Sequence, residues 1–420
     1  MRSGRGRGGG PTIETTFEVN DELRRVASGL AGRGLCAECF GRVVGRAGHG
    51  LSNPERAERL RAAVPGITFA EGTACRLCAG AFDRWETWLR RSEEAARGYE
   101  WHRFTVGSRW DPELLAREEA IWTEVGSPLG ESARAAFNRE LGKRLAARTG
   151  AEGGPAPADL TFLVDLAAGR VEVTLGSVYV EGRYRKLDRT LPQTRWPCRR
   201  CAGRGCERCH GSGKMYPESV EELVAAPFVE ASAAEGTRFH GMGREDIDAR
   251  MLGRGRPFVL ELLRPHRRSL DLPALQAEVN ARSAGRVEVE GMVAADATAV
   301  IRVKESSPLK SYRVVVRGEV PEAKINEALA LVPRRAIAQR TPTRVVHRRA
   351  DRVRTRRIVA VTLAECGPGR FTLELRAEAG TYIKEWVEGD GGRTDPSLAQ
   401  LLGAPLAVES LDVLEIHDQE

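Results

Sequence analysis

Three carboxylates lie close together in one glycine-punctuated segment of the chain. Residues Phe239–Phe258 contain Glu245, Asp246 and Asp248, together with the basic residues Arg244, Arg250, Arg254 and Arg256. A segment of this kind ahead of a strand is typical of a loop that presents side chains to a cleft. The arginines would keep a carboxylate ionised and would attract an anionic backbone. Such a carboxylate can act as a nucleophile or as a proton acceptor, although a surface loop of salt bridges explains the composition equally well.

The cysteines form a second group with the spacing of metal ligands. Eight of the nine cysteines fall into C-x-x-C pairs, and the chain shows no secretion signal that would favour disulfides. The second four stand among glycines, whose positive-φ turns let amide N–H groups point at sulfur. We therefore expect two structural four-thiolate zinc sites, one made by Cys36, Cys39, Cys75 and Cys78 and the other by Cys198, Cys201, Cys206 and Cys209.

Other readings of the cysteines stay open. A redox-active dithiol or chance pairing would explain the first group, and the CxxCxGxG pattern of the second also occurs in zinc modules of DnaJ-like chaperones. A catalytic metal is not expected, because it would need an open coordination position beside acid–base groups. Cys366 is left over in a strand-like stretch, where a buried inert thiol is the expectation.

The charge of the chain indicates a polyanionic partner. The net charge is +7 and the pI is about 9.0, and clustered cations release counterions when they neutralise phosphates. Two segments concentrate this charge, Gly182–Arg189 and Arg334–Arg357, and each suits an RNA-gripping loop or a solvated charged face. The candidate RNA contacts are Arg183, Arg185, Lys186, Arg244, Arg348 and Arg349.

These residues need a multidomain α+β scaffold to position them. The chain divides into a Gly/Arg tail at 1–12, a four-cysteine module at 13–97, a mixed domain at 98–196, a four-cysteine knuckle at 197–215 and a large mixed-sheet domain at 216–420. Helices are expected at 112–122, 131–148, 272–282, 322–330 and 396–402. Strands are expected at 160–166, 171–180, 258–263, 285–291, 312–316, 357–363 and 371–376.

Several classes of function lose support. The chain has no P-loop, no GxGxxG after a strand and no HExxH, so nucleotide-dependent, dinucleotide and zinc-protease chemistry are disfavoured. No apolar run approaches the roughly 18 residues that span a bilayer, so no membrane role is expected. Without a signal peptide the protein is expected in the cytoplasm. Nothing indicates an obligate protein partner.

The segment Gly243–Gly253 resembles the catalytic loop of the archaeal-type tRNA pseudouridine synthases that act on T-loop uridines 54 and 55. Four further segments match that family in order and spacing: 180–189 with 192–196, 309–314, 339–349 and 380–397. Residues 104–180 resemble a THUMP-type RNA-binding domain. The resemblance implies a pseudouridine-synthase catalytic domain preceded by a THUMP-like domain and zinc modules, with tRNA as the partner.

The resemblance also assigns roles to residues. It implies that Asp246 is the catalytic carboxylate, with Asp248 as the alternative. It places Tyr312 against the target base, Tyr382 in the same pocket, and Lys384 beside Asp246, where it would hold the carboxylate in place. The implied reaction breaks the bond from ribose to uracil N1, turns the base and rejoins it to ribose through C5, which needs no redox change and no cofactor.

Two other functions remain as alternatives. A non-catalytic RNA-binding or chaperone-like zinc protein would explain the cysteines and the charge, and would bind tRNA without isomerising a base. A tRNA methyltransferase with a THUMP-like domain would show a cofactor-dependent gain of mass; the missing glycine-rich cofactor loop counts against it.

Overall fold

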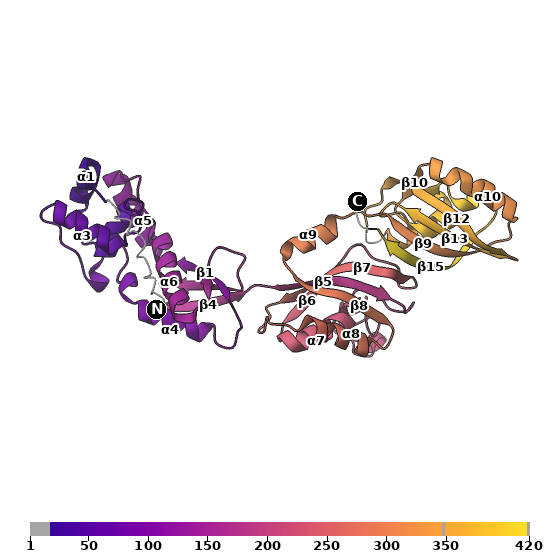
Figure 1. The fold of residues 1–420 in the computed structure, drawn as a ribbon, viewed down its shortest axis with the longest axis horizontal. Coiled ribbons are helices and arrows are strands. Elements are labelled where there is room, and N and C mark those ends of the chain that lie inside the picture. The colour runs from indigo at the N-terminus through magenta and orange to yellow at the C-terminus, as the bar shows by residue number, and fades with distance from the viewer. Residues whose placement is uncertain (1–16, 347–348, 418–420) are drawn as a thin grey trace, which may run out of the picture. The chain divides into compact units, whose positions relative to one another are not determined.

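The chain folds into two compact units that divide between Gly176 and Ser177 (Figure 1). The structure, a computed structural model, describes residues 17–346 and 349–417. The expected tail at 1–12 and the candidate RNA contact Arg348 lie outside these residues. Within them, no helix has the length and apolar character needed to pass through a membrane.

Unit 1 combines helices and a small sheet. Its helices are α1 (Asp21–Leu30), α2 (Ala37–Gly41), α3 (Asn53–Ala63), α4 (Trp85–Ala95), α5 (Pro112–Val125) and α6 (Ala133–Thr149). Its strands are β1 (Arg103–Arg109), β2 (Glu152–Gly153), β3 (Leu160–Asp165) and β4 (Arg170–Leu175). The strands form one sheet in the order β2-β1-β3-β4, and β1 runs parallel to both of its neighbours.

A single aromatic core joins the cysteine-containing part of unit 1 to its sheet. Phe137 of α6 has no exposed area, and its ring lies 6.0 Å from Phe82 and 5.2 Å from Trp85, centroid to centroid. Trp110, directly after β1, lies 5.8 Å from the same ring. The boundary expected at residues 97 and 98 therefore does not separate two cores.

Unit 2 is built on an eight-stranded sheet. The order is β12-β13-β9-β15-β7-β5-β8, with β6 paired to β7 beside this path, and a small sheet has the order β11-β10-β14. The strands are β5 (Val178–Lys186), β6 (Gly236–Gly241), β7 (Arg250–Leu263), β8 (Val287–Ala295), β9 (Lys310–Arg317), β10 (Ile337–Arg340), β11 (Val353–Arg356), β12 (Ile358–Gly367), β13 (Arg370–Ala377), β14 (Thr394–Asp395) and β15 (Ala407–Ile416).

Helices cover the sheet of unit 2. They are α7 (Val220–Ser232), α8 (Leu272–Ser283), α9 (Ala297–Glu305), α10 (Glu322–Leu331), α11 (Ile383–Glu388) and α12 (Leu398–Leu402). In Figure 1, α7 and α8 lie on one side of β5, β7 and β8, and α9 lies on the other side. The expected helices at 272–282 and 322–330 are confirmed by α8 and α10.

The two halves of the large sheet meet where β7 and β15 run side by side. Arg250 pairs with Asp412 and Met251 with Val413, in a parallel register, whereas the other pairings described for this sheet are antiparallel. The segment carrying the three carboxylates enters β7 at this junction. It therefore lies where side chains from both halves of the sheet can converge.

The structure corrects the boundary expected at residue 196. One continuous strand was expected over 171–180, but the chain forms β4 and β5 on either side of Gly176, and β5 pairs with β7 and β8. A Cβ at Gly176 would lie 2.3 Å from the carbonyl oxygen of Ala158, so only glycine fits this turn. Residues 177–196 therefore belong with unit 2.

The expectation for Cys366 is also wrong. Its thiol is exposed, because β12 is the outermost strand of the large sheet and its far end carries exposed side chains. Strand-like sequence alone does not distinguish an edge strand from a central one.

The shared aromatic core makes a first prediction about stability. Phe137→Ala should lower the free energy of unfolding of unit 1 by about 3–5 kcal/mol, because it opens a cavity among four aromatic rings. Denaturant unfolding followed by tryptophan fluorescence measures the change. Leu331→Ala, at a side chain that is 42% exposed, is the control and should stay within about 0.5 kcal/mol of wild type. A loss below about 1 kcal/mol for Phe137→Ala would contradict a common core.

Candidate active site

A pocket of about 450 Å³ opens at the junction of the two half-sheets. This is within the range of about 300–1,000 Å³ that small-molecule sites occupy. Its walls come from the loop between β6 and β7, from β9 and β15, and from the start of α11; the lining includes Arg244, Asp246, Arg256, Lys310, Tyr312, Arg344, Arg349, Tyr382 and Lys384. The four site residues predicted from the sequence, Asp246, Tyr312, Tyr382 and Lys384, thus line one pocket.

The loop at residues 242–249, here the Asp246 loop, presents one carboxylate to this pocket. Asp246 lines the pocket with a side chain that is 27% exposed. Asp248 is not among the lining residues, and its side chain is 66% exposed. Geometry therefore favours Asp246 over Asp248 as the reactive group.

Two cations flank Asp246, and the nearer one was missed from the sequence. Arg344 Nη1 lies 2.7 Å from Asp246 Oδ1, whereas Lys384 Nζ lies 3.9 Å from Asp246 Oδ2. Lys384 instead pairs with both oxygens of Asp248, at 2.6 and 2.8 Å. Burial opposes ionisation of Asp248, but Lys384 outweighs it and lowers the pKa of that carboxyl. Lys384 is shared between two carboxylates and belongs mainly to Asp248.

Arg344 is fixed by a second, buried carboxylate. Its Nε lies 2.5 Å from Glu385 Oε1, and the Glu385 side chain is only 7% exposed. Burial opposes the charge on Arg344, but Glu385 and Asp246 outweigh it and raise the pKa of the guanidinium. Arg344 lies within the segment 339–349 that matched the known family, but the density of arginines there gave no reason to single it out.

A buried ion pair supports the Asp246 loop from beneath. Arg256 Nε lies 2.9 Å from Glu245 Oε2, and the two side chains are 1% and 0% exposed. Tyr184 donates its hydroxyl to Glu245 at 3.0 Å, and Arg256 Nη1 donates to the carbonyl of Met242 at 2.6 Å. Gln193 Nε2 donates to the Tyr184 oxygen at 2.7 Å and to the carbonyl of Gly243 at 3.0 Å. Glu245 is therefore a support of the loop.

Two tyrosines line the pocket. Burial, opposed by Arg256 and aided by Asp246, raises the pKa of Tyr312 to about 12, so its hydroxyl stays protonated at neutral pH. Tyr382 directly precedes α11, and the Gln339 amide holds its backbone through hydrogen bonds to both N–H and C=O, each 2.9 Å long. Arg349 Nη1 donates to the Tyr382 hydroxyl at 3.0 Å.

Lys310 is a second pocket cation that the sequence did not single out. Burial and the neighbouring Arg256, opposed by Glu245, lower the pKa of Lys310 to about 8. Its ammonium lines the same pocket as Asp246 and Tyr312. The site therefore combines one accessible carboxylate, two phenols and several cations.

The remaining expected RNA contacts lie around the strands that hold this pocket. Arg183 donates to the carbonyl of Gly255 at 3.1 Å, and Arg185 pairs with Glu288 at 2.8 Å. Arg244 is exposed, with its guanidinium 5.6 Å from the centre of the Trp196 ring. These three side chains lie outside the buried core of unit 2.

Lys186 does not fit its expected role as an RNA contact. Its side chain is fully buried on β5, on the same face as Tyr184, and its ammonium donates to main-chain carbonyls. A phosphate could not reach it without displacing the Asp246 loop. The sequence pattern of alternating cations did not distinguish the inward face of β5 from the outward one.

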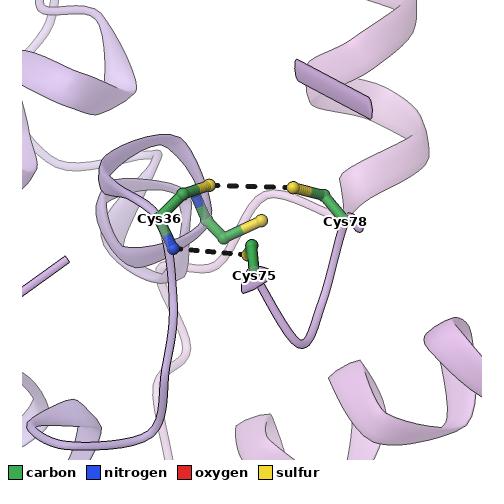
Figure 2. A group of neighbouring side chains, drawn as sticks. Cys36, Cys75 and Cys78 are labelled. Carbon is green, nitrogen blue, oxygen red and sulfur yellow. Dashed lines mark hydrogen bonds between the residues drawn. The ribbon is translucent and has the colours of Figure 1, made fainter. Parts of the chain in front are cut away.

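The first group of four cysteines lies in unit 1, between the start of α2 and a facing loop. Figure 2 shows Cys36, Cys75 and Cys78 in this arrangement. Cys36 Sγ lies 3.7 Å from Cys78 Sγ, the Cys36 amide donates to Cys75 Sγ, and all four sulfur atoms lie within 4.8 Å of one another. Zn–S bonds of about 2.3 Å in a tetrahedron place sulfurs about 3.8 Å apart, so this group can hold a metal ion.

The second group forms a compact knuckle in unit 2. Cys198 and Cys206 have sulfurs 3.9 Å apart, and Cys201 and Cys209 are separated by the same distance. The amides of Gly205 and Gly213 donate to the sulfurs of Cys201 and Cys209, each at 3.2 Å. At Gly213, with φ of 69°, a Cβ would lie 2.3 Å from the carbonyl oxygen of Gly203, so glycine is required there.

Comparison with known proteins relates most of the chain to one family. The family model described as Pus10, C-terminal, matches residues 179–417, and the archaeal Pus10 THUMP domain matches residues 88–165. A tRNA pseudouridine synthase Pus10 of Methanothrix thermoacetophila is 41% identical over 414 residues, which is 91% of this chain and 91% of that protein.

A second relative and a solved structure were also compared with the chain. A tRNA pseudouridine synthase Pus10 of Halorubrum lacusprofundi is 40% identical over 419 residues, 95% of this chain and 97% of that protein. Among solved structures, a Cbf5–Nop10–Gar1 complex covers 47% of this chain and 45% of its own, with 21% identity and a TM-score of 0.30. At that TM-score the structural likeness carries no weight.

The buried pair beneath the Asp246 loop generates a second prediction. Glu245→Gln should destabilise unit 2 by about 3–5 kcal/mol, because it leaves the charge of Arg256 buried without a partner. Chemical denaturation measures the loss. Glu319→Gln, an exposed carboxylate in the same unit, is the matched control and should have an effect within about 0.5 kcal/mol. Equal stabilities for the two variants would show that the pair does not support the loop.

Proposed function

Since this chain belongs to the Pus10 family, we propose that it isomerises uridine to pseudouridine in the T-loop of tRNA, at position 54, position 55 or both. The observation that carries the proposal is Asp246, an accessible carboxylate in a pocket that also contains two tyrosines and flanking cations. A tRNA-modifying enzyme works where tRNA is found, and we place this one in the cytoplasm.

The reaction requires a carboxylate and no external reagent. The bond from ribose C1′ to uracil N1 breaks, the base turns, and C1′ bonds to C5; C5 loses one proton and N1 gains one, so atoms and electrons balance. Asp246 can attack the sugar or the base to hold a covalent intermediate, or it can take a proton from the sugar. In each case Arg344 and Lys384 flank the two oxygens of the Asp246 carboxylate.

The aromatic and cationic walls suit a flipped-out uridine. A base in a folded T-loop is stacked, and a protein that removes it recovers part of the lost stacking on aromatic side chains. Tyr312 and Tyr382 supply such faces. The protonated hydroxyl of Tyr312 can donate to a uracil carbonyl or to the leaving N1.

Electrostatics support tRNA as the partner. The net charge of the chain is +7, and the pocket rim carries Arg244 and Arg349. Arg183 and Arg185 on β5 are further candidates for phosphate contacts, together with Arg348. The THUMP domain matched at residues 88–165 would bind the tRNA body.

We further propose that both cysteine groups hold structural zinc. The sulfur separations of 3.7–3.9 Å fit a tetrahedral four-thiolate ion, which leaves no open position for a substrate. Bound zinc would close the loop between Cys39 and Cys75 and fix the knuckle of residues 198–209. The chemistry at Asp246 does not need either ion.

The catalytic role of Asp246 is directly testable. Asp246→Asn should slow T-loop pseudouridine formation by at least about 10²–10⁴-fold while tRNA binding persists, because the amide can neither attack nor accept a proton. Carbodiimide treatment followed by primer extension maps the product on an unmodified transcript. Asp248→Asn is the matched comparison and should retain most activity.

The possible failures differ from one another. Activity in Asp246→Asn together with its loss in Asp248→Asn would move the catalytic role to Asp248. Tight tRNA binding by the wild-type protein without any pseudouridine would favour a non-catalytic RNA-binding zinc protein.

The metal proposal makes a fourth prediction. Purified protein should contain about two zinc ions per chain by plasma mass spectrometry, and Cys209→Ser should reduce this to about one. Cys366→Ser, at the exposed cysteine outside both groups, is the control and should lose none. A chain that folds and modifies tRNA with no bound metal would refute a structural role.

A further inference from the structure

The basic segment 183–189 contains two cations that are engaged with the protein itself: Lys186 is fully buried, and the Arg189 side chain is 33% exposed. It comprises the end of β5 and the residues after it, and its sequence predicted a track for RNA phosphates. In the fold, Lys186 and Arg189 reach the main chain of the Asp246 loop.

The Lys186 ammonium uses all three of its donors on main-chain carbonyls. It donates to the carbonyls of Ile247 at 2.6 Å, Leu191 at 2.9 Å and Asp246 at 3.1 Å. An ammonium has three donors and no acceptor, so it is fully satisfied there. No salt bridge from Lys186 to a carboxylate is found among the described residues.

Arg189 continues the same pattern at the next residue of the loop. Its Nη1 donates to the carbonyl of Asp248 at 2.9 Å and to that of Leu411 at 3.2 Å, and its Nη2 lies 2.6 Å from Asp412 Oδ1. Three consecutive carbonyls, at residues 246, 247 and 248, therefore accept hydrogen bonds from two cations three positions apart in the chain.

We propose that Lys186 and Arg189 are positioning residues for the reaction, acting as a cationic clamp on the main-chain carbonyls of the Asp246 loop. The clamp fixes the three peptide planes that follow the Asp246 Cα, and the first of these planes helps to set the direction in which the carboxylate leaves the backbone. The inference rests on the proposed function, because it assigns Asp246 the chemistry that is being positioned.

Physical reasoning favours a clamp over a phosphate contact. Lys186 has no exposed area. If its ammonium bound a phosphate instead, the buried carbonyls that it now contacts would lose their hydrogen-bond donors, which is unfavourable. A misplacement of about 1 Å at a reacting group can cost about a hundredfold in rate. A clamp that holds the main chain beside Asp246 therefore affects the chemical step more than it affects binding.

The test compares Lys186→Met with wild type under single-turnover conditions at saturating tRNA. Methionine keeps an unbranched stem of similar length and removes the three donors. The rate constant of pseudouridine formation should fall by about 10–100-fold with full amplitude, while the Kd for tRNA and its salt dependence stay unchanged within about twofold. Lys324→Met, at an exposed lysine of α10, is the matched control and should equal wild type.

Each result decides between a clamp and its alternatives. A rate constant within about threefold of wild type overturns the clamp. A weaker Kd together with a salt slope smaller by about 0.7–0.9 identifies a phosphate contact instead. A reduced amplitude with an unchanged rate constant identifies a merely structural role.

A second variant keeps the test decisive if Lys186→Met does not fold. Arg189→Met removes the donor to the carbonyl of Asp248 and leaves Asp412 paired with Arg250 at 2.7 Å. Its rate constant should fall by about 3–10-fold at unchanged Kd, and a wild-type rate overturns the clamp. If the wild-type protein makes no pseudouridine, the proposed function is wrong. If the wild-type protein and both clamp variants are equally active, only the clamp is wrong.

Discussion

The buried ion pair between Glu245 and Arg256 is the constraint on which the site depends. Two charges removed from water are costly unless their hydrogen bonds are complete. Here Tyr184 and the carbonyl of Met242 complete them, and Gln193 ties the Tyr184 hydroxyl to Gly243. Glu245 directly precedes Asp246, so fixing the first carboxylate inward directs the second one into the pocket.

This arrangement explains why the site lies at the junction of the half-sheets. β7 supplies Arg256 beneath the loop, and it runs beside β15, which in turn pairs with the strand that carries Tyr312. The small sheet adds Gln339, which holds Tyr382 and thereby the start of the helix bearing Lys384. The charged side chains of the site form a continuous row of ion pairs. Arg344 pairs with both Asp246 and Glu385, and Lys384 pairs with both Asp246 and Asp248.

The sequence predicted which residues meet but not how they pair. Asp246, Tyr312, Tyr382 and Lys384 were found because a family resemblance in several ordered segments singled them out, and the cysteine groups because four thiols at short spacing have few uses. Arg344 was not predicted as a site residue, because nothing in the sequence distinguishes it from the many other arginines nearby. Lys186 was misjudged because burial depends on strand pairing, which an alternation of basic residues does not reveal.

The fold shows the same division. The bounds of helices such as α8 and α10 were predicted to within one residue. Domain limits failed where tertiary packing overrides local pattern: Phe137 unites two expected modules, and Gly176 breaks one expected strand into two that belong to different units. An exposed Cys366 reflects an edge position that no local sequence feature marks.

A structure of the full chain with a T-stem-loop RNA that carries 5-fluorouridine at positions 54 and 55 would show directly whether Asp246 faces the target ribose. Fluorine replaces the hydrogen that must leave C5, so the reaction stops with the target in place. We expect a flipped-out base against Tyr312, with its ribose facing Asp246 and the Lys186 ammonium still hydrogen-bonded to the carbonyls of the Asp246 loop. A base bound away from this pocket, or a ribose facing Asp248 instead, would contradict this expectation.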